Sequence, residues 1–275
     1  MVSVGPRDGA VIRPYGRAQN TWLRRLAWIV ILVGGVAAYL LVLWAMVSTR
    51  NLNFFPALLL IGSITVPMTV LVFAEEGGRF LPVPPWSVIM TAIVGGIVGV
   101  VAAGVLEYST LRQLHTVPMV LIGLIEEASK LIVPLVLYLI WRPTEARGGI
   151  VIGVASGMGF ATLETMGYGF QALLAAQNLS AVDATLLLRG ILSPACHIAW
   201  TGLTVAMLWR IRVARHRGAA IGLFVLVYLL ASGFHAVWDS SVDLLVHVVI
   251  AVIGFVALMI FIFFSHHWRR RPATA

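Results

Sequence analysis

Three ionisable residues, Glu126, Glu127 and Lys130, lie near the middle of an apolar stretch that runs from about residue 117 to 141. The stretch is long enough to cross a bilayer, which takes roughly 20 apolar residues. Each charged side chain at the centre of such a helix costs about 2.5–3.5 kcal/mol on insertion scales. Helical spacings of three and four residues let both carboxylates approach the ammonium of Lys130, the only lysine in the chain. An ionisable cluster in a spanning helix indicates a functional site.

Four more ionisable residues, Glu164, His197, His235 and Asp239, lie inside later apolar stretches. His235 and Asp239 are four residues apart, so one helix face presents an imidazole and a carboxylate together. Such groups suit the activation of water against a peptide carbonyl, with a glutamate as general base. Two histidines and an Asp or Glu can also hold a zinc ion. The spacing differs from the His-Glu-x-x-His of soluble metalloproteases, so the residues alone leave the metal open.

The composition excludes an ordinary soluble domain. The chain has 275 residues, of which 60% are hydrophobic and only 11% charged, whereas soluble domains have about 25% charged residues. We therefore expect an integral membrane protein, an all-α bundle of spanning helices. The net charge of +8 comes from arginines scattered in short loops, so membrane topology, and not nucleic-acid binding, explains it. A single cysteine excludes an internal disulfide.

Hydropathy predicts eight spans, with seven spans and one re-entrant segment as the alternative, because the last two are separated only by residues 240–243. The predicted spans are at about 26–48, 54–74, 85–106, 117–141, 148–174, 184–209, 218–239 and 244–265. They make one transmembrane domain, 26–265, with the ionisable core at about 117–240. Residues 1–25 and 266–275 are predicted to be basic cytoplasmic tails, the first of them disordered.

The arginines also predict the orientation. With the N-terminus inside, 15 of the 18 arginines fall in cytoplasmic segments, and only Arg50, Arg112 and Arg189 fall on or near the other side. Both termini are therefore expected in the cytoplasm. At about 1.5 Å per residue, Glu126 and Glu164 come at mid-depth or in the outer half of the membrane. We expect water to reach the ionisable groups from the extracytoplasmic side.

Other chemistries are less well supported by the residues. Cys196 is expected to face away from its neighbour His197 and to lack an activating base. Ser193 and His197 have a hydrolase-like spacing, but no oxyanion hole is evident in the sequence. Asp243 and His247 are expected to form an interfacial pair. Buried charges also suit a proton- or ion-coupled transporter, although the matched broken helices of transporter repeats are not found. A non-catalytic membrane scaffold is a third alternative.

Four motifs, one for each helix and in the same order, resemble those of the PrsW intramembrane proteases. This family is related to the CAAX prenyl endopeptidases and to a scaffold subunit of gamma-secretase. The resemblance covers about residues 117–239. Its motifs are Glu126-Glu127-x-x-Lys130, Phe160-x-x-x-Glu164 with Tyr168, His197, and His235-x-x-x-Asp239.

The resemblance implies an α-helical endopeptidase of the bacterial cytoplasmic membrane. Its substrate would be a membrane-anchored protein, such as an anti-sigma factor, cut near the extracytoplasmic face. CAAX endopeptidases have histidine where this chain has Glu164, which argues against prenylated substrates. The resemblance leaves open whether Zn²⁺ or a glutamate alone activates the water. The expected catalytic residues are Glu126, Glu127, Lys130, Glu164, His197, His235 and Asp239, and the expected metal ligands are Glu164, His197, His235 and Asp239.

Overall fold

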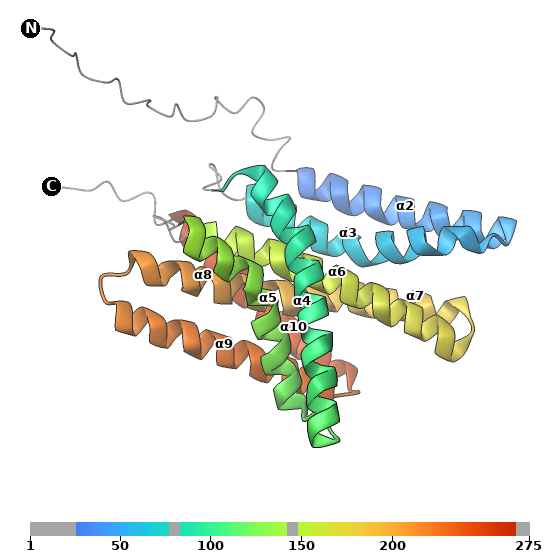
Figure 1. Ribbon diagram of the computed structural model, residues 1–275. Coiled ribbons are helices and arrows are strands. Elements are labelled where there is room, and N and C mark those ends of the chain that lie inside the picture. Colours follow the sequence, from blue (N-terminus) through green and yellow to red (C-terminus); the bar gives the residue numbers. More distant parts are fainter. Residues whose placement is uncertain (1–25, 77–82, 142–147, 268–275) are drawn as a thin grey trace, which may run out of the picture.

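The computed structural model describes residues 26–76, 83–141 and 148–267, with side chains as far as Phe264. Every regular element in these ranges is a helix (Figure 1). The elements are α2 (Ala27–Thr49), η1 (Leu52–Phe54), α3 (Phe55–Glu76), α4 (Pro85–Leu114), α5 (Met119–Trp141), α6 (Gly148–Ala176), α7 (Leu179–Ser193), η2 (Pro194–Ile198), α8 (Ala199–Val213), α9 (Arg217–Ser240) and α10 (Leu244–His267).

The helices confirm the all-α, multi-pass prediction. Seven segments of the described chain are long and apolar enough to cross a membrane, and α7, η2 and α8 count as one of them, Leu179–Val213. Helix α5 has 23 residues and is as long as α2, but its three ionisable residues set it apart by composition. With α5 included, the segments correspond to the eight predicted spans. The N-terminal tail lies outside the described residues, and the side of the membrane on which each terminus lies stays a prediction.

Two segments are longer than hydropathy suggests. Helix α4 continues to Leu114, where the predicted span ends at about 106, and the α7–α8 segment begins at Leu179, where the prediction begins at about 184. The earlier start has a local cause, because the Asn178 side chain caps α7 by accepting a hydrogen bond from the backbone N–H of Ala181 at 2.9 Å. Arg189, which the predicted span already contained near its end, therefore lies well inside α7.

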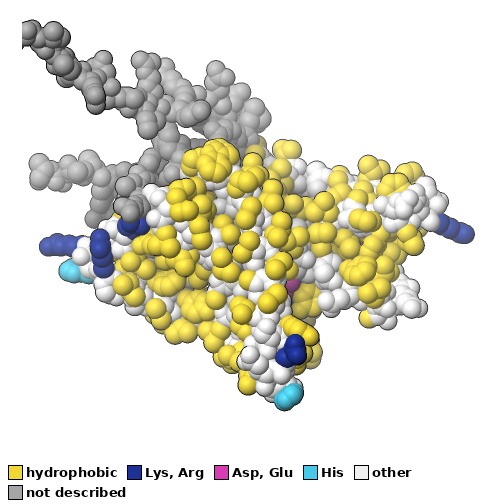
Figure 2. Space-filling view, in the orientation of Figure 1, with side chains coloured by type: hydrophobic (Ala, Val, Ile, Leu, Met, Phe, Trp, Pro, Cys, Tyr) yellow, Lys and Arg dark blue, Asp and Glu magenta, His cyan; other side chains and the backbone are white. Residues whose placement is uncertain are grey.

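Apolar side chains cover most of the face seen in Figure 2, and the Lys and Arg side chains visible there lie at its extremities. Helix α2 is the extreme case, since only 6% of its apolar window is buried inside the protein. A soluble monomer rarely exposes so large an apolar patch. The lipid of a bilayer accounts for it, because apolar side chains facing hydrocarbon need no protein cover.

Helix α6 is the centre of the bundle, and it packs against α3, α4, α7 and α8. Its first fifteen residues, Gly148 to Thr162, are all buried. Small residues let the neighbouring backbones come close: a Cβ atom added at Gly159 would overlap the carbonyl oxygen of Ala92 and lie 3.0 Å from the Cα of Gly96 on α4. Small-residue contacts of this kind hold membrane helices together. Helices α4 and α5 lie side by side and cross α6 obliquely (Figure 1).

Candidate active site

Helix α5 brings the two adjacent carboxylates and the lysine together, as their spacing predicts. Lys130 Nζ donates to Glu127 Oε1 at 2.8 Å and lies 3.5 Å from Glu126 Oε2. The Lys130 side chain is fully buried, with its ammonium 4.3 Å from the centre of the Phe160 ring on α6. The two carboxylates and the aromatic face together compensate the positive charge of the buried ammonium.

A proline fixes the backbone beneath Lys130. Pro134 has no N–H, so the carbonyl of Lys130, four residues earlier, lacks its intrahelical donor. The Ser156 hydroxyl on α6 donates to that carbonyl at 2.8 Å. In a membrane, such freed backbone groups must find partners within the protein. This contact ties the first motif to α6 at the level of the site.

His197 lies on η2, a five-residue π-helix that joins α7 to α8. Pro194 begins this wider turn, and π-helical turns occur frequently at functional sites. Gly157 on α6 allows the turn to come close, because a Cβ there would lie 2.9 Å from the His197 carbonyl oxygen and 3.0 Å from Ile198 Cα. The His197 imidazole is completely buried as a result.

His235 and Asp239 come from α9, which packs directly on α5. Gly123 on α5 makes this approach possible, since a Cβ there would overlap the Ser232 carbonyl oxygen and lie 3.1 Å from the backbone nitrogen of Ala236. His235 is one helical turn beyond Ser232 on α9, so the close crossing carries its ring to the α5 carboxylates. The two imidazole rings meet edge to face, with 4.9 Å between their centres.

The Nδ1 atom of each imidazole contacts the α5 cluster. His235 Nδ1 lies 2.8 Å from Glu127 Oε1, and because a carboxylate only accepts, the ring donates through Nδ1. In a neutral His235 ring the Nε2 atom is then the unprotonated nitrogen. His197 Nδ1 lies 2.8 Å from Lys130 Nζ. An ammonium only donates, so in this arrangement the His197 proton is on Nε2. Glu127 and Lys130 thus fix the orientation of both rings from one side.

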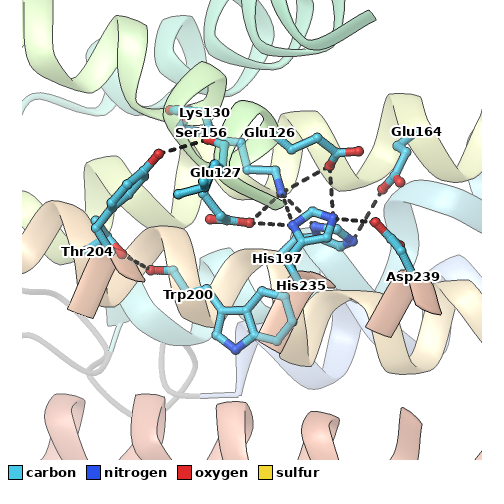
Figure 3. A network of polar contacts seen from close by, with 12 residues as sticks. Glu126, Glu127, Lys130, Ser156, Glu164, His197, Trp200, Thr204, His235 and Asp239 are labelled. Atoms are coloured by element: carbon cyan, nitrogen blue, oxygen red, sulfur yellow. Dashed lines mark hydrogen bonds and ion pairs between the residues drawn. The ribbon is translucent and has the colours of Figure 1, made fainter. Parts of the chain in front are cut away.

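The Nε2 atoms point to the opposite side, where the other carboxylates lie (Figure 3). His235 Nε2 is 3.2 Å from Glu126 Oε2 and 3.2 Å from Asp239 Oδ2. His197 Nε2 is 3.3 Å from Glu164 Oε2, which α6 supplies. The structure therefore brings all seven site residues named from the sequence into one contact network.

Comparison with known proteins agrees with this geometry. A family model described as PrsW family intramembrane metalloprotease matches residues 83–265. The chain belongs to this family. No curated protein and no solved structure gave a significant match. The PrsW match covers all four motifs and the helices α4 to α10 that carry or surround them. Membership makes the chain an intramembrane protease, whose substrate is a protein in the membrane.

The metal that the PrsW family name implies can be tested against the donor atoms. Four buried atoms on the Nε2 side have no hydrogen-bond partner among the described residues: Glu126 Oε2, Glu164 Oε2, His197 Nε2 and His235 Nε2. Donor atoms of Glu126, His197 and His235 lie within 4.8 Å of one another. Two histidines and one glutamate are a ligand set of catalytic zinc sites. The residues therefore fit a metal ion, with Glu126 as a donor that the sequence prediction had not placed among the ligands.

Arg189 is the site residue that the sequence prediction missed. Its Nη2 atom lies 2.8 Å from Glu164 Oε1, and its guanidinium carbon is 3.7 Å from the centre of the Tyr168 ring. The predicted span at 184–209 contained Arg189, but the orientation argument used it only as a charge near the span end. The cap at Asn178 is the sequence signal that places the helix start further out, with Arg189 well inside the helix.

The other candidate chemistries gain no support. Both ring nitrogens of His197 lie against Lys130 and Glu164, so the ring is not directed at the Ser193 hydroxyl. Cys196 is a buried free thiol. His247 contacts the backbone carbonyls of Asp243 and Trp238 at 2.8 and 3.1 Å. The expected pairing of the Asp243 and His247 side chains is thus replaced by contacts to the backbone.

Proposed function

We propose that this PrsW family member hydrolyses a peptide bond of a membrane-anchored protein at a metal ion held by Glu126, His197 and His235. The observation that carries the proposal is the buried His₂Glu arrangement, whose donor atoms lie within 4.8 Å of one another. Catalytic zinc sites use three protein ligands and keep a further position for water or substrate. Zn²⁺ is therefore the metal we propose.

The charges around the site favour a divalent cation. Four carboxylates belong to the network, from Glu126, Glu127, Glu164 and Asp239, and two permanent cations, Lys130 and Arg189, contact them. With neutral imidazoles, this leaves two uncompensated negative charges in a membrane interior. Buried charges are paired or coordinate metals, because desolvation is otherwise very expensive. A divalent ion would offset much of this negative charge.

We assign Glu127 and Lys130 to positioning the imidazoles. The Glu127–His235 contact is the carboxylate–histidine pair that commonly fixes the tautomer and the basicity of a metal-binding histidine. Since Lys130 donates to His197 Nδ1, a ligand role for His197 requires the loss of one proton from this pair. Metal binding to protein sites ordinarily releases protons in this way.

The remaining carboxylates are assigned to the reaction side. When bound, the ion would supply a Lewis acid for the scissile carbonyl and for the attacking water. Asp239, whose Oδ2 atom is 3.2 Å from His235 Nε2, is the proposed acceptor of the water proton. Glu164 is held by Arg189 and lies against His197. The two imidazoles are fully buried, whereas the side chains of Glu126, Glu164 and Asp239 are 11–17% exposed, so water and peptide would approach over the carboxylates.

The proposed substrate is a membrane-anchored protein, such as an anti-sigma factor, in a bacterial cytoplasmic membrane. The arginine distribution predicts both termini in the cytoplasm and the carboxylates toward the extracytoplasmic side, which supports this substrate class.

The test is cleavage of a co-expressed panel of single-span membrane proteins by the wild type and by Glu126→Gln and His235→Ala at matched expression. We expect cleavage of at least one substrate by the wild type and by neither variant, with bound zinc absent from both variants. Cleavage by metal-free wild type would show that the reaction needs no ion, and would favour a water activated by glutamate alone. Folded wild type that cleaves nothing would contradict the proposal and leave a transport or scaffold role to be tested by ion flux.

A further inference from the structure

The contact between Arg189 and Glu164 joins α7 to the reaction side of the site. Arg189 Nη2 lies 2.8 Å from Glu164 Oε1, and the two side chains are only 13% and 12% exposed. The other oxygen, Glu164 Oε2, points at His197 Nε2 at 3.3 Å and has no hydrogen-bond partner among the described residues. One oxygen of the carboxylate is thus held and the other is left for the site.

Aromatic packing fixes the guanidinium itself. Tyr168 is one helical turn beyond Glu164 on α6, and the centre of its ring lies 3.7 Å from the guanidinium carbon of Arg189. A planar guanidinium can stack on a ring and pair with a carboxylate at the same time, which a lysine ammonium cannot do. Glu164, Tyr168 and Arg189 therefore form one unit, which we call the α6–α7 clamp.

The clamp is separate from the contacts that hold the imidazoles. Lys130 and Glu127 fix the Nδ1 atoms of His197 and His235 from α5. No permanent cation of α5 is within ion-pair distance of Glu164 in the described structure, and the guanidinium that pairs with it comes from α7. Without Arg189, Glu164 would be a poorly compensated carboxylate in the membrane and free to rotate away from His197.

We infer that Arg189 is a positioning residue for the proteolytic site, which holds Glu164 so that its Oε2 atom faces His197 and the proposed ion. The inference rests on the proposed function, because Glu164 needs this orientation only if the carboxylate acts at the site. Residues that support the ligands of a metal site typically contribute 10–100-fold to metal affinity. Arg189 acts through Glu164 and is not assigned any contact with the substrate.

The test compares Arg189→Gln, Arg189→Lys, Glu164→Gln and the double variant Arg189→Gln/Glu164→Gln. Arg112→Gln is the matched control, since Arg112 is exposed at the end of α4 and its guanidinium is 5.9 Å from the Tyr108 ring. For each purified protein we would measure zinc affinity by chelator competition, thermal stability, and kcat and KM for a cleaved substrate. The double variant tests whether the two residues act as one unit.

We expect Arg189→Gln to weaken zinc binding by at most about 10–100-fold and to lower kcat with little change in KM. Its Tm should fall below that of Arg112→Gln, because Glu164 loses its cation. Arg189→Lys should be intermediate, and the double variant should be no worse than Glu164→Gln alone. Unchanged zinc affinity and kcat in Arg189→Gln, or additive effects in the double variant, would overturn the inference. A Tm loss that accounts for the whole effect would show a structural role instead.

The outcomes separate this inference from the proposed function. If the wild type cleaves without zinc and Arg189→Gln still lowers kcat, the positioning role of Arg189 is supported and the proposed metal ion is contradicted. Wild type that neither cleaves nor binds zinc would contradict the proposed function, and the inference with it. Wild type that does both while Arg189→Gln behaves like the Arg112→Gln control would contradict the inference alone.

Discussion

Glu126 and Glu127 are adjacent in sequence, but their contacts differ, so we expect the same substitution to have different effects at the two positions. Glu127 Oε1 accepts two contacts of 2.8 Å, from Lys130 Nζ and from His235 Nδ1, and all three side chains are buried. Glu126 Oε2 is 3.5 Å from Lys130 and 3.2 Å from His235 Nε2. Glu127 supports the site, and Glu126 faces its centre.

The expected magnitudes follow from these contacts. Glu127→Gln removes the closer charge partner of a fully buried ammonium, and breaking a buried ion pair from one side costs about 3–5 kcal/mol. The glutamine amide is also a weaker acceptor than the Glu127 carboxylate for the His235 Nδ1–H, so His235 is less firmly oriented and zinc affinity should fall by about 10–100-fold. Glu126→Gln removes the more distant carboxylate, 3.5 Å from the ammonium, and leaves the 2.8 Å contact with Glu127, so it should lower the free energy of unfolding by less than Glu127→Gln does. It should nevertheless abolish zinc binding and cleavage.

The assay combines equilibrium unfolding in mixed detergent micelles with cleavage measured over a series of zinc concentrations. Excess zinc should restore much of the cleavage by Glu127→Gln, because its ligands are all present, and none of the cleavage by Glu126→Gln. The reasoning is refuted if the two variants are equally stable. It is also refuted if zinc restores cleavage by Glu126→Gln and not by Glu127→Gln.

Two further predictions concern the packing that positions the site. Ser156→Ala should destabilise the protein by about 1–2 kcal/mol and lower activity, because it leaves the Lys130 carbonyl without a donor. Ser109→Ala is the control and should be neutral in the same unfolding assay, since the Ser109 hydroxyl bonds only within its own exposed helix turn. Gly159→Ala should cost about 1–3 kcal/mol by forcing α4 away from α6. Gly167→Ala on the same helix, where an added Cβ meets nothing within 4 Å, is its control, and an equal loss of stability in the two would contradict the packing argument.

The fold was largely predictable because the bilayer imposes a simple rule. A helix that crosses it needs a long apolar stretch, and an ionisable residue in that stretch needs a reason. Hydropathy therefore places each helix along the chain, although α4 continues well past its predicted end, and spacing alone brings Glu126, Glu127 and Lys130 together on α5. The same logic selects the two histidines, which lie in later apolar stretches.

The arrangement around each imidazole was not predictable. Which ring nitrogen faces which carboxylate depends on the rotation of α9 against α5, and Gly123 sets that rotation through a backbone contact with Ser232. Pro194 signals a break in a helix, but not the π-helical turn that carries His197. The contact of Arg189 with Glu164 was not predicted, because a charge profile does not show which arginines pair with a carboxylate inside the bundle.

We propose that proteolysis by this protein requires an ion held by both imidazoles and Glu126. The most direct measurement is metal content and substrate cleavage on the same purified, reconstituted wild-type preparation, followed by X-ray absorption at the zinc edge. We predict one zinc for each active site, with two imidazole nitrogens and carboxylate oxygen at about 2.0–2.2 Å. Full cleavage by protein that contains far less than one metal ion per chain would contradict the claim, as would a zinc site with one imidazole or none.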